Sequence, residues 1–225
     1  MELKYYGIEK AENVSPKICE QVGTLDEYTF AKNVGPTDFL TEEEIKNVVH
    51  PLKFNGKSKI TEAVYYFFRL YVNERIKNIL EEYNIIKHQY IKATFKTKSN
   101  ELLSYYYLHI PLPGVTDYVD YKKSTFTETT ILGVDKSIVN DVDVNSKEKI
   151  RAKEIEKQKD LLYSIQTKDI VFSKKFDPKT DIFILLDRPS GYDYFVSERL
   201  KNRLEQENVT GIVFKEYPYK ISISE

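Results

Sequence analysis

The hydrophobic and polar positions of the chain alternate with period two over several segments, which is typical of strands. The clearest of these is 63–72, which carries apolar or aromatic residues on both faces and contains one charged residue, Arg69. A strand that is apolar on both faces is expected inside a sheet, so 63–72 predicts one central strand. Further strands are predicted at 1–9, 22–30, 86–96, 101–110, 168–173, 181–186, 192–196 and 211–217.

A helical period replaces the alternation at 74–83, 146–165 and 198–207, and a shorter capped helix is predicted to begin at Thr41. The 146–165 helix is highly charged and carries only a thin apolar stripe, formed by Ala152, Ile155, Leu162 and Ile165. We interpret its charges as a solvated face, with a partner surface as the alternative. Residues 114–145 keep no sustained period and predict no element.

Two segments 124 positions apart, 71–85 and 195–209, match at eight of fifteen positions. Their end chemistry matches too: Asn73 and Ser197 are good N-caps, and Asn84 and Asn208 stand where a left-handed residue usually closes a helix. An internal match of this kind predicts a duplicated strand–helix–strand module, against the alternative that two amphipathic helices merely share Glu and Lys.

The two helices differ in their apolar faces. The first has the full stripe of a helix packed on a core, formed by Ile76, Ile79, Leu80 and Tyr83, whereas the second keeps only Leu200 and Leu204. We therefore expect the second helix to be the more exposed one and the better candidate for meeting a partner.

An arginine in the first turn of each helix, Arg75 and Arg199, opposes the helix dipole and has no carboxylate at i+3 or i+4. We expect both to meet a tertiary carboxylate or carbonyl, in a structural role rather than in recognition.

Taken together, these elements predict an α+β fold of mainly antiparallel or mixed sheets, with a few short helices. One module copy falls in each half, 1–115 and 116–225, and we expect the halves to form one compact unit.

Composition adds limits to this picture. The chain has 225 residues with 18 Tyr, 12 Phe and no Trp, which favours sheet. The net charge of −1 argues against a strongly basic nucleic-acid binder and against attraction to a membrane. Cys19 is the single cysteine, so no disulfide can form within the chain. The N-terminal residues lack a signal-peptide pattern and no apolar run is long enough to span a bilayer, so we expect a cytoplasmic protein.

Common catalytic and metal-binding motifs match only in part. Gly56-Lys57-Ser58 resembles the end of a phosphate-binding loop, but Pro51 occupies the place of its first glycine. The acidic stretch 141–145 begins like a calcium loop, yet Ser146 and Ala152 stand where the turn glycine and the bidentate glutamate are needed. The histidines His50, His88 and His109 have no second ligand at a metal-binding spacing. The sequence therefore predicts no enzyme, no cofactor and no metal.

The C-terminal module resembles a known family. Tyr-Phe-Val-Ser-Glu-Arg-Leu-Lys at 194–201, followed by Val-Thr-Gly-Ile-Val-Phe at 209–214, is similar to the closing module of the immunity proteins found beside bacterial polymorphic toxins. Segments 70–75, 118–124 and 181–183 resemble further elements of that family. Asn73 replaces the usual serine but keeps the capping function.

The resemblance implies a non-catalytic protein that binds and neutralises a cognate toxin of the same bacterium, and it carries over no catalytic residue. Two alternatives stay open: a scaffolding protein that self-associates through its Tyr-rich sheet, and an enzyme with an unrecognised carboxylate site. For a toxin-binding surface we predict contacts near the second helix, at Tyr192, Tyr194, Arg199 and Arg203, because Tyr and Arg bury area while keeping a hydrogen-bonding group.

Overall fold

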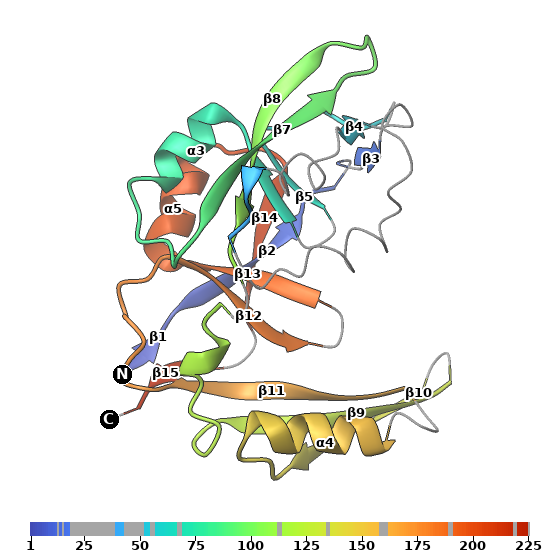
Figure 1. Cartoon of the computed structure of the whole chain (residues 1–225), viewed down its shortest axis with the longest axis vertical. Coiled ribbons are helices and arrows are strands. Elements are labelled where there is room, and N and C mark those ends of the chain that lie inside the picture. Colours follow the sequence, from blue (N-terminus) through green and yellow to red (C-terminus); the bar gives the residue numbers. More distant parts are fainter. Residues whose placement is uncertain are drawn as a thin grey trace.

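A computed structural model describes residues 1–12, 14, 16–18, 39–42, 52–54, 57–66, 69–111, 114–133, 136–157, 162–188, 191–217 and 220–224. Their strands form three sheets, antiparallel or mixed, accompanied by short helices (Figure 1). The predicted α+β fold is confirmed. The predicted strand at 22–30, most of the helix expected from Thr41, Cys19 and His50 lie outside the described residues.

The first sheet has six strands in the order β3-β4-β7-β8-β6-β5. Helix α3 (Glu74–Leu80) connects β6 to β7. The strand bounds are β3 (Pro16–Ile18), β4 (Leu52–Phe54), β5 (Ala63–Tyr66), β6 (Arg69–Val72), β7 (Gln89–Lys96) and β8 (Leu102–His109).

The second sheet has four antiparallel strands in the order β12-β13-β2-β14. Helix α5 (Glu198–Gln206) connects β13 to β14. The bounds are β2 (Tyr5–Lys10), β12 (Ile182–Arg188), β13 (Gly191–Ser197) and β14 (Ile212–Glu216).

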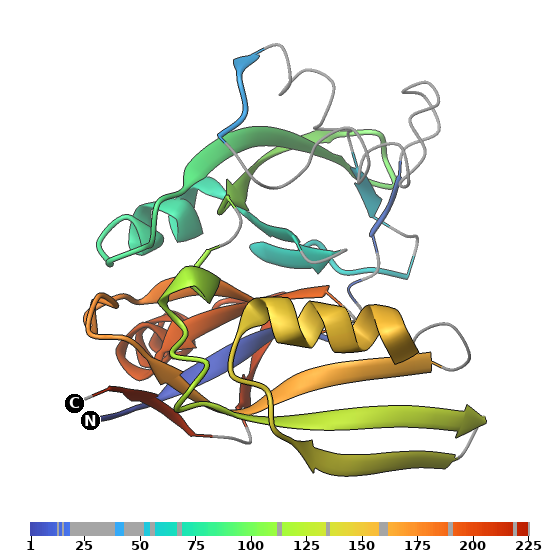
Figure 2. The same ribbon diagram turned by 60° about the horizontal axis from the view of Figure 1, so that its bottom comes forward.

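The third sheet has the order β1-β15-β11-β9-β10. The bounds are β1 (Glu2–Leu3), β9 (Thr125–Gly133), β10 (Lys136–Val142), β11 (Leu162–Phe172) and β15 (Ile221–Ile223). A 3-10 turn at Thr116–Tyr118 precedes β9. Helix α4 (Lys147–Lys157) lies along β11, and β10 forms the outer border of the sheet (Figure 2). We call β9, β10, α4 and the first half of β11, residues 125–166, the arm.

The segment 63–72 is a hairpin and not the single strand predicted. The chain reverses between Tyr66 and Arg69, and Ala63 pairs with Val72. Periodicity cannot distinguish one long buried strand from two short ones that pack on the same core, because both are apolar on both faces. Tertiary packing of the two short strands selects the hairpin.

The predicted helix at 146–165 is also corrected. Helix α4 ends at Lys157, and Leu162 and Ile165 belong to strand β11. Ile150 is the apolar residue of α4 that packs on the arm's core, whereas Ile155 is 57% exposed. The stretch 114–145, which predicted no element, contains the long β9–β10 hairpin.

The duplication is confirmed where the sequence predicted it. The Asn73 side chain accepts a hydrogen bond from the Ile76 amide (3.0 Å), and the Ser197 hydroxyl accepts one from the Leu200 amide (3.3 Å). The end chemistry agrees only in part: Asn208 is left-handed, with φ of 54°, whereas Asn84 is not among the left-handed residues.

The structural repeat is larger than the matched segments. Strands β5-β6-β8-β7 of the first sheet correspond in order and direction to β12-β13-β2-β14 of the second. We call each set of four strands with its helix a unit, the first with α3 and the second with α5. The registers also correspond, since Val72 pairs with Tyr106 as Val196 pairs with Tyr6. The third strand of each unit is therefore equivalent in space, although β8 follows its helix and β2 comes from the start of the chain.

One hydrophobic core joins the two units. Its buried residues come from both sheets and both helices, and include Ile8, Leu70, Ile76, Leu108, Val196 and Leu200. A second cluster, with Phe172, Phe183 and Phe195 at its centre, joins the second sheet to the third. The two units thus stabilise each other by burying their apolar faces in one shared core.

Candidate partner-binding surface

The residues predicted for partner binding lie on β13 and α5. Tyr192 belongs to β13, with its side chain outside the described part of the structure. Tyr194 is fully buried: its hydroxyl donates to the Leu108 carbonyl and its ring packs edge-on against Tyr65. Burial raises the pKa of Tyr194 well above its usual value. The expectation of a surface position for Tyr194 is corrected, because strand alternation turns it into the shared core.

Arg199 is held by a carboxylate of its own unit. Its Nε and Nη2 atoms donate to Asp181 Oδ1 (2.7 Å) and Oδ2 (2.5 Å), and its guanidinium lies over the Tyr83 ring, 5.4 Å from the centroid. The hydrogen bond to Asp181 raises the pKa of Arg199 further. Asp181 is 1% exposed and also accepts from the Ser197 hydroxyl (2.5 Å) and the Asn84 amide (2.9 Å). The bidentate pair therefore fixes the start of α5.

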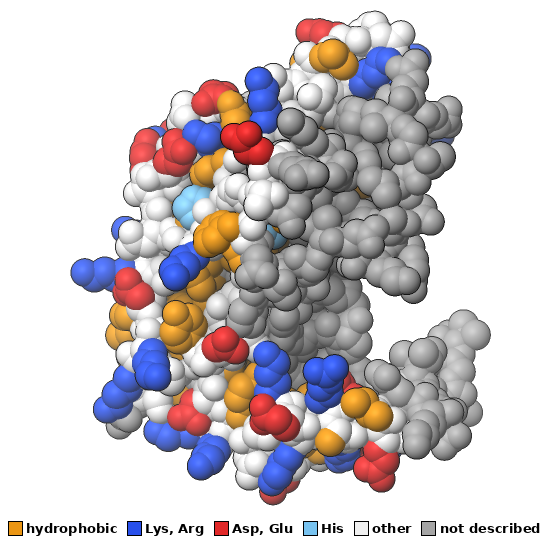
Figure 3. Space-filling model, in the orientation of Figure 1, with side chains coloured by type: hydrophobic (Ala, Val, Ile, Leu, Met, Phe, Trp, Pro, Cys, Tyr) orange, Lys and Arg blue, Asp and Glu red, His pale blue; other side chains and the backbone are white. Residues whose placement is uncertain are grey.

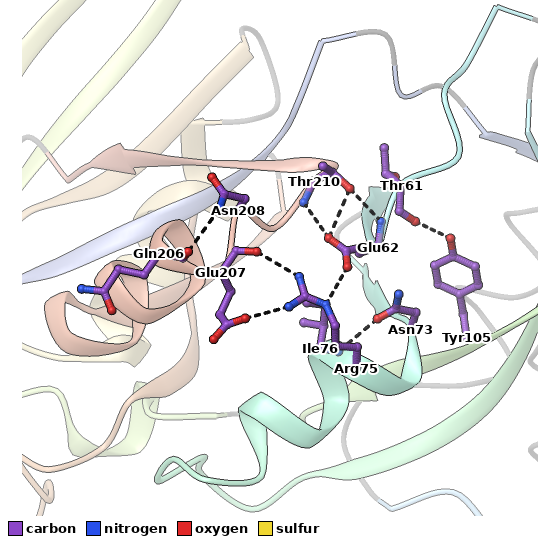
Figure 4. Close-up of polar contacts among 10 residues, drawn as sticks. All are labelled: Thr61, Glu62, Asn73, Arg75, Ile76, Tyr105, Gln206, Glu207, Asn208 and Thr210. Carbon is purple, nitrogen blue, oxygen red and sulfur yellow. Dashed lines mark hydrogen bonds and ion pairs between the residues drawn. The ribbon is translucent and has the colours of Figure 1, made fainter.

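Arg75 occupies the equivalent place in the first unit (Figure 4). Its Nε donates to Glu62 Oε1 (2.7 Å), while Nη1 and Nη2 donate to the Glu207 carboxylate (2.8 Å) and carbonyl (3.0 Å). The hydrogen bond from Arg75 lowers the pKa of Glu62. The prediction that both arginines meet a tertiary carboxylate or carbonyl is confirmed.

We call each arginine with its carboxylate a clamp, Arg75 with Glu62 and Arg199 with Asp181, and each clamp also reaches the other unit. Glu62 and Asp181 each precede the first strand of a hairpin, and their carbonyls accept from the cap amides of Asn73 (2.8 Å) and Ser197 (2.9 Å). Each arginine then crosses to the end of the other unit's helix, where Glu207 and Tyr83 occupy matching positions of the repeat. The arginines thus join the two units as well as capping their own hairpins.

The remaining charges of the paired helices are mostly engaged within the chain. Arg203 bonds Glu207 (3.0 Å), Lys77 bonds Glu81 (2.7 Å) and Lys201 bonds Glu205 (2.7 Å). Figure 3 shows charged side chains of both signs interspersed over this view of the surface, with hydrophobic side chains in small groups between them. Most charged side chains described on α3 and α5 are therefore paired within the chain, which leaves few of them to pair with a partner.

The arm carries a different surface. Ile138 and Val139 on β10 are 48% and 58% exposed, and Ile155 on α4 also faces solvent. Helix α4 has no buried residue and is held to the sheet by Ile150, by the Lys153–Glu128 ion pair (2.7 Å) and by the Glu154 carboxylate, which accepts from the Ile165 amide (3.2 Å). The stripe residue Ile155 consequently points outward, which fits the partner-surface alternative for this helix.

The described histidines have structural surroundings. His88 Nδ1 lies 3.0 Å from the Ile86 carbonyl and its ring packs on Tyr90, while His109 is buried beside Tyr107. Within the described residues, no three His, Cys, Asp or Glu side chains gather closely enough to hold a metal ion. No described helix has both the length and the apolar composition needed to cross a membrane.

Comparison with known proteins decides the family. The model of an immunity protein family, Imm11, matches residues 35–218. The chain belongs to the Imm11 immunity protein family. A search of curated proteins finds no match. The family resemblance seen in the C-terminal module is thereby confirmed, and it extends over both units.

The Imm11 match begins after strand β2, which completes the second unit from outside the matched range. The sequence did not identify Glu62 and Asp181 as the partners of Arg75 and Arg199, although the repeat contains a signal for them. Thr-Glu at 61–62 and Thr-Asp at 180–181 stand before equivalent hairpins, and Tyr-Tyr recurs at 5–6 and 105–106. In both units the first of those tyrosines donates to the threonine carbonyl, Thr180 or Thr61.

Proposed function

We propose that this Imm11 member protects its producer by binding a cognate toxin in the cytoplasm and holding it inactive, without chemical turnover. The observation that carries the proposal is the family match over residues 35–218. Immunity in such a family requires a protein partner, and the partner for this chain is the toxin encoded beside it.

The architecture supports binding over catalysis. The arginines of α3 and α5 are paired with carboxylates of the same chain, namely Glu62, Asp181 and Glu207, and such closed networks rigidify a scaffold. A preorganised surface loses little conformational entropy on association, which favours tight binding by a protein that performs no reaction. Near-neutral net charge also favours recognition by shape and local contacts over long-range attraction.

The test is expression of the adjacent toxin in a sensitive host, with and without this chain, followed by titration of purified toxin. We expect rescue of growth and an isolable complex, with inhibition complete at about one equivalent, as tight binding requires. Neutralisation at far less than one equivalent, increasing with time, would indicate an enzyme instead. Absence of both rescue and complex formation would refute the toxin-binding function.

A further inference from the structure

Strand β10 is an open sheet edge. It ends the order β1-β15-β11-β9-β10, and β9 is its partner among the described strands. A strand in this position presents a row of unpaired amides and carbonyls along its outer side, which can template pairing with another chain. In Figure 2 β10 borders the arm on the side away from the two units.

This edge is regular and carries little protection. From Ser137 to Val142 the pairing with β9 keeps one register over six residues, and the single irregularity falls before it, between Lys136 and Ser137. Residues 137–140 are Ser-Ile-Val-Asn, without charge or proline. Natural edges are usually guarded by such residues, so an unguarded one is expected to have an occupant. The charged residues of β10 are Lys136 at its start and Asp141 near its end, so 137–140 is the unguarded stretch.

The exposed apolar residues of β10 lie on opposite faces of the sheet. Ile138 is opposite Thr130, which shares a face with Glu128 because side chains alternate along β9. Glu128 binds Lys153 of α4, so Ile138 is on the α4 face and Val139 on the other. A helix lying on one face of the sheet could cover only one of them, whereas an added strand contacts both through its own alternating side chains.

We propose that the outer edge of β10 is the docking site for an extended segment of the toxin, which adds to the sheet as a further strand. The proposal rests on the toxin-binding function and names its surface. Main-chain hydrogen bonds would supply much of the affinity, and side chains opposite Ile138 and Val139 would supply selectivity.

Charge limits the sequence of the incoming strand. Asp141 ends the exposed stretch and Asp143 follows it, and Lys168 bonds Asp141 (3.1 Å), so this end of the edge keeps one net negative charge. The complementary segment is β-branched or aromatic opposite Ile138 and Val139 and carries a cation beside Asp143.

The experiment measures the affinity of the purified, inactivated toxin for the wild-type chain, for Val139→Lys and for the control Val213→Lys. Val213 is 46% exposed on the edge strand β14, so the control adds the same charge to another sheet edge. We expect Val139→Lys to weaken binding by about tenfold or more, while Val213→Lys stays within about twofold. Hydrogen exchange of the amides of 137–142 should slow when toxin is added, which reports on the backbone independently of either substitution.

Each other outcome overturns the proposal in a distinguishable way. Toxin binding that Val139→Lys leaves intact, without slower exchange at β10, would place the interface elsewhere and leave the toxin-binding function standing. A toxin-free dimer that Val139→Lys separates would make a second copy of this chain the occupant. Failure of the wild-type chain to bind the toxin would remove the proposed function and this docking site together.

Discussion

At the scale of single residues, the two arginine clamps are alike in position but differ in burial. Asp181 is 1% exposed and receives hydrogen bonds from Arg199, Ser197 and the Asn84 amide. The Glu62 side chain is 26% exposed and shares Arg75 with Glu207. Removal of a buried acceptor leaves its donors without hydrogen-bond partners, whereas water can take the place of an exposed acceptor. The same contact should therefore contribute unequally in the two units.

We predict that Asp181→Ala lowers the free energy of unfolding by about 2–4 kcal/mol, because it removes a buried acceptor that receives hydrogen bonds from Arg199, Ser197 and the Asn84 amide. Glu62→Ala is the matched control from the other unit and should cost about 1 kcal/mol, since its surroundings are open to solvent. Urea unfolding monitored by circular dichroism measures both. Equal losses would show that burial does not set the strength of these clamps.

The Glu62 clamp also predicts a pH dependence. Arg75 lowers the pKa of Glu62 below its usual 4.5, so the unfolded chain takes up this proton at a higher pH than the folded one. The stability that Glu62 contributes is present above about pH 4.5 and is lost as the pH falls through the folded pKa. The difference in unfolding free energy between wild type and Glu62→Gln should therefore shrink on acidification. Glu82→Gln on the exposed surface is the charge control, and a constant difference for Glu62→Gln would contradict the prediction.

At the scale of elements, the arm shows how a charged helix can be held without a buried stripe. Helix α4 has a net surplus of cations and contacts its sheet through one half-buried isoleucine and polar links to Glu128 and Ile165. Ala152 and Ile155 are exposed because Ile150, Lys153 and Glu154, which contact the sheet, lie on the opposite side of the helix.

This orientation predicts different outcomes for the two isoleucines of α4. Ile150→Ala should lower the free energy of unfolding by about 1–2 kcal/mol, because Ile150 is half-buried and packs against the hydrophobic cluster of the arm. Ile155→Ala should change it by less than about 0.5 kcal/mol, as is usual for exposed positions. Chemical denaturation of both variants decides the orientation. The reverse order would mean that Ile155 faces the sheet.

At the scale of the whole molecule, the second unit is completed by the start of the chain. Strand β2 pairs with both β13 and β14 and contributes Tyr6 and Ile8 to the core shared by the two units. The chain ends lie close together, since β1 pairs with β15 (Figure 1). Folding of the second unit therefore depends on contacts between residues at opposite ends of the sequence, which are costly in loop entropy.

Removal of residues 1–10 should abolish cooperative unfolding of the entire chain, because it removes the pairings of β2 with β13 and β14 and of β1 with β15, and exposes the shared core. Removal of residues 1–3 is the control: it deletes β1 and should lower the melting temperature by no more than about 5 °C. Near-ultraviolet circular dichroism on heating distinguishes the two results. A cooperative transition after loss of residues 1–10 would show that β2 is dispensable.

The sequence by itself determined the local features, namely the two capped helices, their strand neighbours, the α+β class and the family. The helices and strands rest on contacts within a few residues, namely a cap, a helical stripe or an alternating strand, and the family rests on motifs along the chain. Tertiary structure decided what the same local pattern could not. It split 63–72 into a hairpin, buried Tyr194, gave Leu162 and Ile165 to a strand, and brought β2 beside β13. Pairing and burial between residues far apart in sequence set those outcomes, and an apolar residue fits several such arrangements equally well.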